Sequence, residues 1–229
     1  MARRIYPRPP IVEAIIEFRL LGEIEASVIV DAIRSELGHE YSESEDTESA
    51  LVADASFLVS RSRLRSIGCA RSYMSVHALA PYPGWEEFRE QALAAAHALA
   101  KGIEGVKAGA LVVRYVDRIR LPMEPEAGFS EYFTIFPMRP AALPEALAGF
   151  RFDTETRSKE GVIARLTVTS EPDDDHDGMT VGYDLLLLRH GAEWSLSDDS
   201  WLPVVEELHV RQREIFEQSI TDRMRELFS

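Results

Sequence analysis

The stretch LVVRYVDRIRL at residues 111–121 has the clearest pattern in the chain, because its apolar and charged side chains alternate. Successive side chains of a strand point to opposite faces of a sheet, so this alternation predicts a strand with one buried face. The buried face would hold Leu111, Val113, Tyr115, Ile119 and Leu121, with Asp117 among them, and the other face Arg114, Arg118 and Arg120. A carboxyl on a buried face needs donors or a positive partner. We therefore expect Asp117 to anchor the strand to a loop or to the last helix.

The segments before this strand indicate a mixed fold. Residues 11–20 alternate in the same way, and residues 51–60 and 63–79 also look like strands. Apolar residues at helical spacing in 26–37 and an alanine-rich composition in 85–101 predict two helices. The resulting order, β-α-β-β-α-β, is ferredoxin-like. The polar, acidic residues 40–49 would form an exposed loop.

The segments after this strand predict more antiparallel sheet. Residues 129–136 look like a strand, and 150–156, 162–169 and 180–189 look like a meander. Residues 201–228 carry the apolar stripe of a long helix, which includes His209.

We therefore predict an α+β protein with two antiparallel-sheet halves. Residues 1–121 would form the ferredoxin-like half, and residues 122–229 the β-meander with its C-terminal helix. No Ser/Gly-rich linker separates the two, so we expect one continuous domain.

The composition narrows the class of partner and the compartment. The 229 residues include 25 Lys and Arg against 39 Asp and Glu, a net charge of −14. This charge disfavours duplex DNA and anionic membranes, and favours a protein partner. A single cysteine, Cys69, and the lack of a secretory signal or a long apolar run predict a cytoplasmic protein. No sequence motif calls for a cofactor.

A second group of arginines lies in RSRLRSIGCAR at residues 61–71. If this segment were a strand, Arg61, Arg63 and Arg65 would share one of its faces. A fourth arginine, Arg71, and the aromatic ring of Tyr73 follow nearby. Such a face could bind an acidic partner or single-stranded RNA. The favoured alternative is pairing with the acidic residues 43–48 just upstream.

Motifs for metals and catalysis are weak. The string DDDHDG at 173–178 has the carboxylate spacing of a calcium loop, with candidate ligands Asp173, Asp175, Asp177 and Asp184. Its flanks predict strands rather than two helices, which favours an exposed hairpin loop. The six histidines lack metal-ligand spacing, and no nucleophile or phosphate-binding motif is present.

Three segments taken together resemble a sporadically distributed bacterial family defined by a TIGR model. They are PPIVEAIIEFRL at 9–20, VRYVDRIRL at 113–121 and ELHVRQREIFEQSITDRMRELF at 207–228. That family usually has Asn at the position of Asp117, which implies a hydrogen-bonding role there. It has no agreed activity, so the resemblance implies no catalytic residue. Its patchy distribution implies an accessory role, as in defence, toxin–antitoxin or specialised gene-cluster systems.

We therefore predict a non-enzymatic accessory protein that acts through protein–protein contacts. One alternative is an RNA-binding or RNA-processing module that uses the arginine-rich face. The other is an enzyme in which Asp117 acts together with His209. The sequence predicts no oligomeric state.

Overall fold

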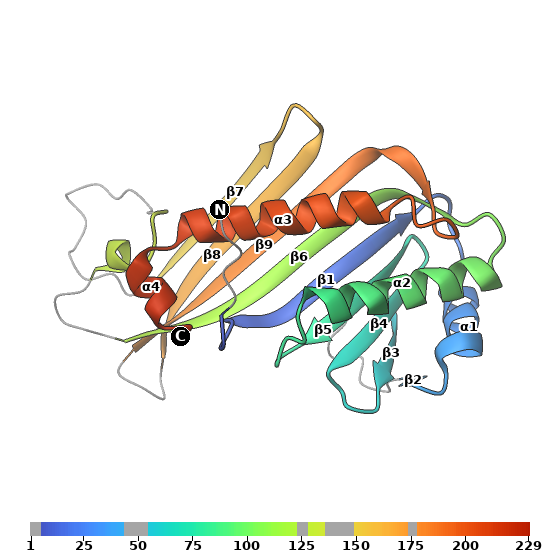
Figure 1. The fold of residues 1–229 in the computed structure, drawn as a ribbon, viewed down its shortest axis with the longest axis horizontal. Helices are drawn as coiled ribbons and strands as arrows, with labels where there is room; N and C mark the ends of the chain where they lie inside the picture. The colour runs from blue at the N-terminus through green and yellow to red at the C-terminus, as the bar shows by residue number, and fades with distance from the viewer. Residues whose placement is uncertain (1–5, 44–54, 123–127, 136–148, 174–177) are drawn as a thin grey trace.

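The computed structural model describes residues 6–43, 55–122, 128–135, 149–173 and 178–229. Within these residues the chain forms one antiparallel sheet covered by helices on one face (Figure 1). The predicted α+β class is confirmed. The strands are β1 Ile11–Leu20, β2 Tyr41–Glu43, β3 Ser56–Ser60, β4 Arg65–Ala70, β5 Tyr73–Leu79, β6 Lys107–Pro122, β7 Phe150–Arg157, β8 Val162–Asp173 and β9 Gly178–Ser195. The helices are α1 Ala26–Leu37, α2 Trp85–Gly102, α3 Leu202–Ser219 and α4 Asp222–Glu226, with a 3-10 turn at Phe129–Glu131.

The strand order is β2-β3-β4-β5-β1-β6-β9-β8-β7. Strand β6 pairs with β1 along one edge and with β9 along the other, so the two predicted halves meet in a single sheet. Strands β7, β8 and β9 form the predicted meander.

Several local expectations were wrong. Residues 63–79, expected as one strand, form β4 and β5 with a turn between them. Part of the expected loop 40–49 is strand β2, which pairs with β3. Residues 129–135 form a 3-10 turn with an isolated bridge from Phe133 to Ile220, rather than a strand. The ferredoxin-like order stays a prediction.

The long C-terminal helix is interrupted at Ile220. That residue is extended, with φ −118° and ψ 153°, because it forms the bridge to Phe133. A new helix, α4, then starts after Thr221, whose side chain accepts a hydrogen bond from the Met224 amide. A polar N-cap of this kind satisfies an amide that the first helical turn would otherwise leave free.

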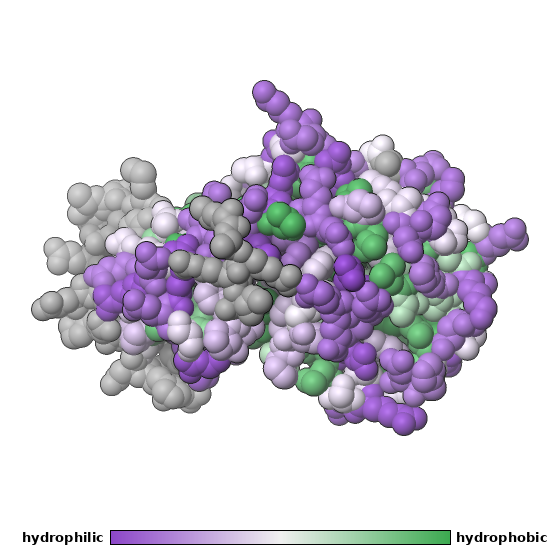
Figure 2. Space-filling model, in the orientation of Figure 1, coloured by the Kyte–Doolittle hydropathy of each residue, from purple (hydrophilic) through white to green (hydrophobic). Residues whose placement is uncertain are grey.

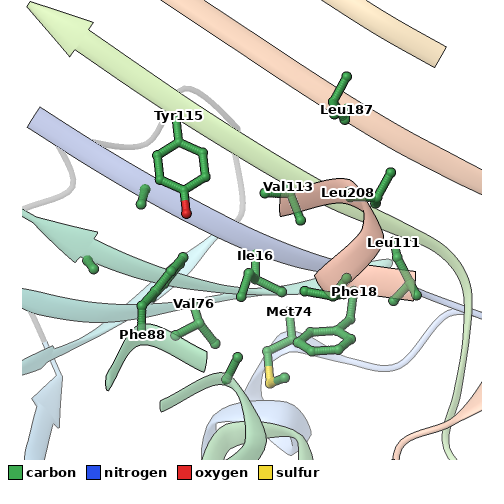
Figure 3. Close-up of a cluster of buried hydrophobic side chains, with 14 of the residues drawn as sticks. Ile16, Phe18, Met74, Val76, Phe88, Leu111, Val113, Tyr115, Leu187 and Leu208 are labelled. Carbon is green, nitrogen blue, oxygen red and sulfur yellow. The ribbon is translucent and has the colours of Figure 1, made fainter. Parts of the chain in front are cut away.

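The main core lies between the sheet and its helices. Figure 3 shows Ile16 and Phe18 from β1 beside Met74 from β5 and Leu111 from β6, all fully buried. This confirms the buried faces predicted for residues 11–20 and 111–121. Figure 1 shows α2 and α3 lying along the same face of the sheet. Figure 2 shows that this side of the molecule is mainly hydrophilic, with smaller apolar areas among the polar side chains.

No helix in the described part of the chain is both long enough and apolar enough to cross a membrane.

Candidate functional site

A cavity of about 360 Å³ lies where five parts of the chain meet. Its walls come from the N-terminal segment 6–11, residues 82–85 in the turn before α2 and at the start of that helix, strands β6 and β9, and residues 209–217 of α3. We call it the Asp117 cavity. Aromatic and proline side chains make up most of its lining, with a few polar and charged groups among them.

The N-terminal wall is held by the end of the chain. The Tyr6 hydroxyl donates to Glu217 Oε1 at 2.7 Å, and its ring packs edge-on against Phe228 at 5.3 Å. The Arg8 amide donates to the Phe228 carbonyl at 3.2 Å. Pro7, Pro9 and Pro10 lack amide donors and favour an extended backbone. The segment meets the sheet at Pro10, whose carbonyl accepts a hydrogen bond from the Arg118 amide of β6 at 3.0 Å.

A hydrogen-bonded row of side chains lines the cavity, from the turn before α2 through β6 to α3. The hydroxyls of Tyr82 and Tyr115 are 3.0 Å apart, and the Tyr115 hydroxyl is 3.0 Å from His209 Nδ1. The Trp85 ring stacks on His209 at 3.9 Å with an angle of 2° between the planes. Burial raises the pKa of Tyr115 well above its ordinary value, so this hydroxyl stays protonated. His209 is therefore held by stacking on one side and by a hydrogen bond on the other.

Asp117 lies on β6, two residues after Tyr115 and directly across from Tyr183 on β9. It is 4% exposed, and no hydrogen bond or ion pair to its carboxyl is found among the described residues. Burial, together with the Asp184 charge, raises the pKa of Asp117 to about 8. Asp117 is thus buried as predicted, but the anchoring contact expected from the sequence is not found in the described part. Instead the carboxyl lines the cavity.

Gln212 is a second polar group with an unused acceptor. Its Nε2 donates to the Leu185 carbonyl at 2.8 Å, while its buried Oε1 has no donor among the described residues. Buried polar atoms normally have partners, so two unpaired acceptors in one cavity lining are unusual.

The arginine face predicted at 61–65 does not form. Arg61 and Arg63 lie in the turn between β3 and β4, and Arg63 has a positive φ of 60°. Only Arg65 belongs to a strand, where it lies 3.7 Å from the Glu40 carboxylate and over the Tyr41 ring. The expected alternating strand face therefore does not exist here, because the chain reverses direction within it.

The two remaining residues of that set lie farther along the chain, Arg71 in the turn between β4 and β5 and Tyr73 at the start of β5. Arg71 forms an ion pair with Glu25 at 3.0 Å, and Tyr73 is half-buried on β5. The acidic residues 44–48, expected to pair with the arginines, lie outside the described residues.

The second arginine set shares one face of β6, as predicted. Arg114 makes a two-point contact with Asp184, with Nε to Oδ1 at 2.8 Å and Nη2 to Oδ2 at 2.6 Å. Arg118 and Arg120 are exposed farther along the strand. By strand alternation this face is opposite the one that carries Asp117, so these arginines are separate from the cavity.

The calcium-loop candidates are not assembled among the described residues. Asp184 is bound to Arg114, only the backbone of Asp173 is described, and Asp175 and Asp177 fall outside the described ranges. In the part of the chain that the structure describes, no three His, Cys, Asp or Glu side chains cluster as a metal site would require. Cys69 is fully buried, and burial raises its pKa to about 12, which keeps the thiol protonated.

Sequence reasoning singled out Asp117 and His209 but missed the rest of this cavity. Trp85, Tyr183 and Gln212 each read as ordinary helix or strand residues, since their roles depend on contacts between distant segments. The PYPGW string at 81–85, which puts two aromatic rings in a turn, was the local signal available. Comparison of the chain with protein-family models and with curated proteins found no match.

Proposed function

We propose that this is a non-enzymatic accessory protein that binds a small ligand in the Asp117 cavity and acts through a protein partner. The observation that carries the proposal is a buried carboxyl, unpaired among the described residues, in the wall of an aromatic cavity. Ligand sites are commonly concave, mainly apolar and equipped with a few polar groups that fix orientation. A cavity of about 360 Å³ falls within the usual size range of such sites.

The partner and accessory parts of the proposal have a different support. They rest on the acidic charge of −14 and on the resemblance to a sporadically distributed bacterial family. Co-expression with the products of neighbouring genes, followed by purification, tests them. A stable complex with one of these products is expected. A protein that stays monodisperse and alone in every co-expression would overturn this part.

Ligand binding is tested with a fragment library observed by saturation-transfer NMR. A Phe216→Trp variant adds bulk to the cavity wall, and Val210→Trp makes the same kind of addition at an exposed position of the same helix. We expect fragments that bind the wild type and Val210→Trp but lose binding in Phe216→Trp. Binding that is equal in both variants, or absent throughout, would refute the cavity as the ligand site.

A second candidate is an enzyme that uses general acid–base chemistry. It is favoured by one observation, that Asp117 and His209 line the same cavity although they are far apart in sequence. A carboxyl whose pKa is about 8 can accept or donate a proton near neutral pH. NMR spectra of fragment hits, incubated with wild type and Asp117→Asn, test it. Conversion by the wild type alone supports catalysis, and unchanged fragments in both samples exclude it for those compounds.

A further inference from the structure

We propose that the occupant of the Asp117 cavity is a small organic cation, an amine whose ammonium group is bound by the Asp117 carboxylate. This inference rests on the proposed binding function and names the chemical class of the ligand. It is argued from the excess of unpaired acceptors, from the aromatic walls, and from the arrangement of the other charges.

The first step is the imbalance of donors and acceptors. The Asp117 carboxyl and the Gln212 Oε1 atom line the same cavity from facing elements, β6 and α3. The Gln212 Oε1 atom is fully buried without a donor among the described residues. No donor to the Asp117 carboxyl is found among those residues either. An unpaired buried carboxylate is costly, and a ligand that brings N–H donors with a positive charge would remove that cost. An anion would instead add a second negative charge beside it.

The second step is the nature of the walls. Aromatic rings from the turn before α2, the first residue of α2, the sheet and α3 line the cavity together with this carboxyl: Tyr82, Trp85, Tyr115, Tyr183 and Phe216. The face of an aromatic ring attracts a cation, and its apolar area accommodates the carbon skeleton of an amine. The lining therefore suits a cationic head and an apolar body together.

The third step concerns the other charged groups in the lining, Glu217 and Arg213. Glu217 is already engaged by Arg225 at 3.0 Å and by the Tyr6 hydroxyl. Arg213 is partly exposed on α3, so water solvates its guanidinium. No ion pair between Arg213 and Asp117 is found among the described residues, and burial together with the Asp184 charge raises the pKa of Asp117. The buried carboxyl is the group that gains most from an added counter-charge.

Binding of an amine should release a proton. With a pKa of about 8, the empty Asp117 carboxyl is mainly protonated at pH 7 and must ionise to pair with an ammonium group. The affinity should therefore rise about tenfold per pH unit up to pH 8 and level off above it. The other titratable or charged groups that line the cavity with Asp117 are Tyr6, Tyr82, Tyr115, Tyr183, His209, Arg213 and Glu217. The Asp184 charge acts on Asp117 from the opposite face of the sheet, where Asp184 pairs with Arg114. Comparing the pH dependence of the amine affinity in the wild type and in Asp117→Asn separates the contribution of these groups, because the substitution removes the titration of Asp117 and leaves the others.

The experiment is calorimetry with three probes that share one ring: phenethylamine, 2-phenylethanol and 3-phenylpropanoate. At pH 8.5 we expect phenethylamine to bind most tightly. Asp117→Asn should lower its affinity about 10- to 100-fold, as loss of a hydrogen bond to a charged group does. Glu214→Gln, the loss of an exposed carboxylate on α3, is the matched control and should leave the affinity unchanged.

Each other outcome has a defined meaning. Equal binding of the alcohol and the amine, or tightest binding of 3-phenylpropanoate, would overturn the cation while leaving the cavity as a ligand site. No binding of any probe would overturn the cation and count against the proposed function as well. If Asp117→Asn does not fold, wild-type titrations at pH 7 in phosphate and in HEPES decide. Release of close to one proton per amine supports the proposal, and no proton release overturns it.

Discussion

The raised pKa of Asp117 makes a quantitative prediction about stability. The folded protein holds this proton with a pKa of about 8, against 3.8 for the ordinary carboxyl. Because the folded state binds the proton more tightly than the unfolded chain, the free energy of unfolding falls as the pH rises between these two values. The slope is about 1.4 kcal/mol per pH unit. From pH 3.8 to pH 7 the loss therefore reaches about 4 kcal/mol, an upper limit because water entry and relaxation reduce it.

Replacement of Asp117 with Asn removes this titration while keeping the size of the side chain. The Asp117→Asn variant should therefore be more stable than the wild type at pH 8, and its advantage should shrink towards pH 4. Urea denaturation at unit steps from pH 5 to pH 9, followed by tryptophan fluorescence, measures the difference. The three tryptophans are suitable probes because all are buried: Trp85, Trp194 and Trp201.

The control is Asp31→Asn, which removes a carboxylate whose side chain is 76% exposed on α1. Its difference from the wild type should stay nearly constant over the same pH range. A constant difference for Asp117→Asn as well would refute the reasoning. A variant that became less stable than the wild type as the pH rose would show that a positive group pairs with Asp117.

Three further predictions concern contacts away from the cavity. The side chains of the Arg114–Asp184 pair are about one-third exposed. A double-mutant cycle with Arg114→Met and Asp184→Asn should therefore give a coupling free energy of about 1 kcal/mol that falls with added salt. A coupling free energy near zero at low salt would contradict this expectation. His77 Nδ1 lies 2.7 Å from Glu13 and lowers its pKa, so Glu13→Gln should destabilise the protein by about 1 kcal/mol at pH 7, less as the pH falls below 4.5. If urea denaturation showed a destabilisation by Glu13→Gln that does not depend on pH, the Glu13–His77 contact would not be its cause. Phe18 is fully buried, and Phe18→Ala should reduce the free energy of unfolding by about 3–5 kcal/mol in the same assay, whereas a loss below 1 kcal/mol would show that the core collapses around the gap.

Alternation made the central strands predictable from sequence. In residues 111–121 one set of side chains is buried and the other is partly or fully exposed, apart from Val112 at 1% exposure. Long strands with a polar face and an apolar face carry enough repeats for such a pattern to be clear.

Turns without glycine or proline were harder to predict. Residues 61–64 form a turn from Arg, Ser and Leu residues, none of them strong turn formers apart from Ser. The Ser60 hydroxyl, which accepts a hydrogen bond from the Arg65 amide, stabilises this reversal, and the sequence pattern does not reveal it. The predicted arginine face failed for this reason.

The cavity could be predicted only in part, because it depends on packing between distant segments. Asp117 was conspicuous as a carboxyl within an apolar pattern, and His209 as a polar residue near an apolar stripe. Their neighbour Tyr6 belongs to a segment that reaches the site through Glu217 and Phe228, more than two hundred positions away. No periodicity in a single segment encodes a contact of that range.

The pairing of β6 on both edges has a consequence for any attempt to divide the protein. A fragment that ends near residue 121 would keep β1 beside β6 but remove β9, leaving a long row of unpaired backbone N–H and C=O groups on β6 open to other chains. Unprotected edges of this kind promote aggregation. We therefore expect such a fragment to be insoluble when it is produced alone, and the chain to tolerate insertions at its surface turns far better than separation at its centre.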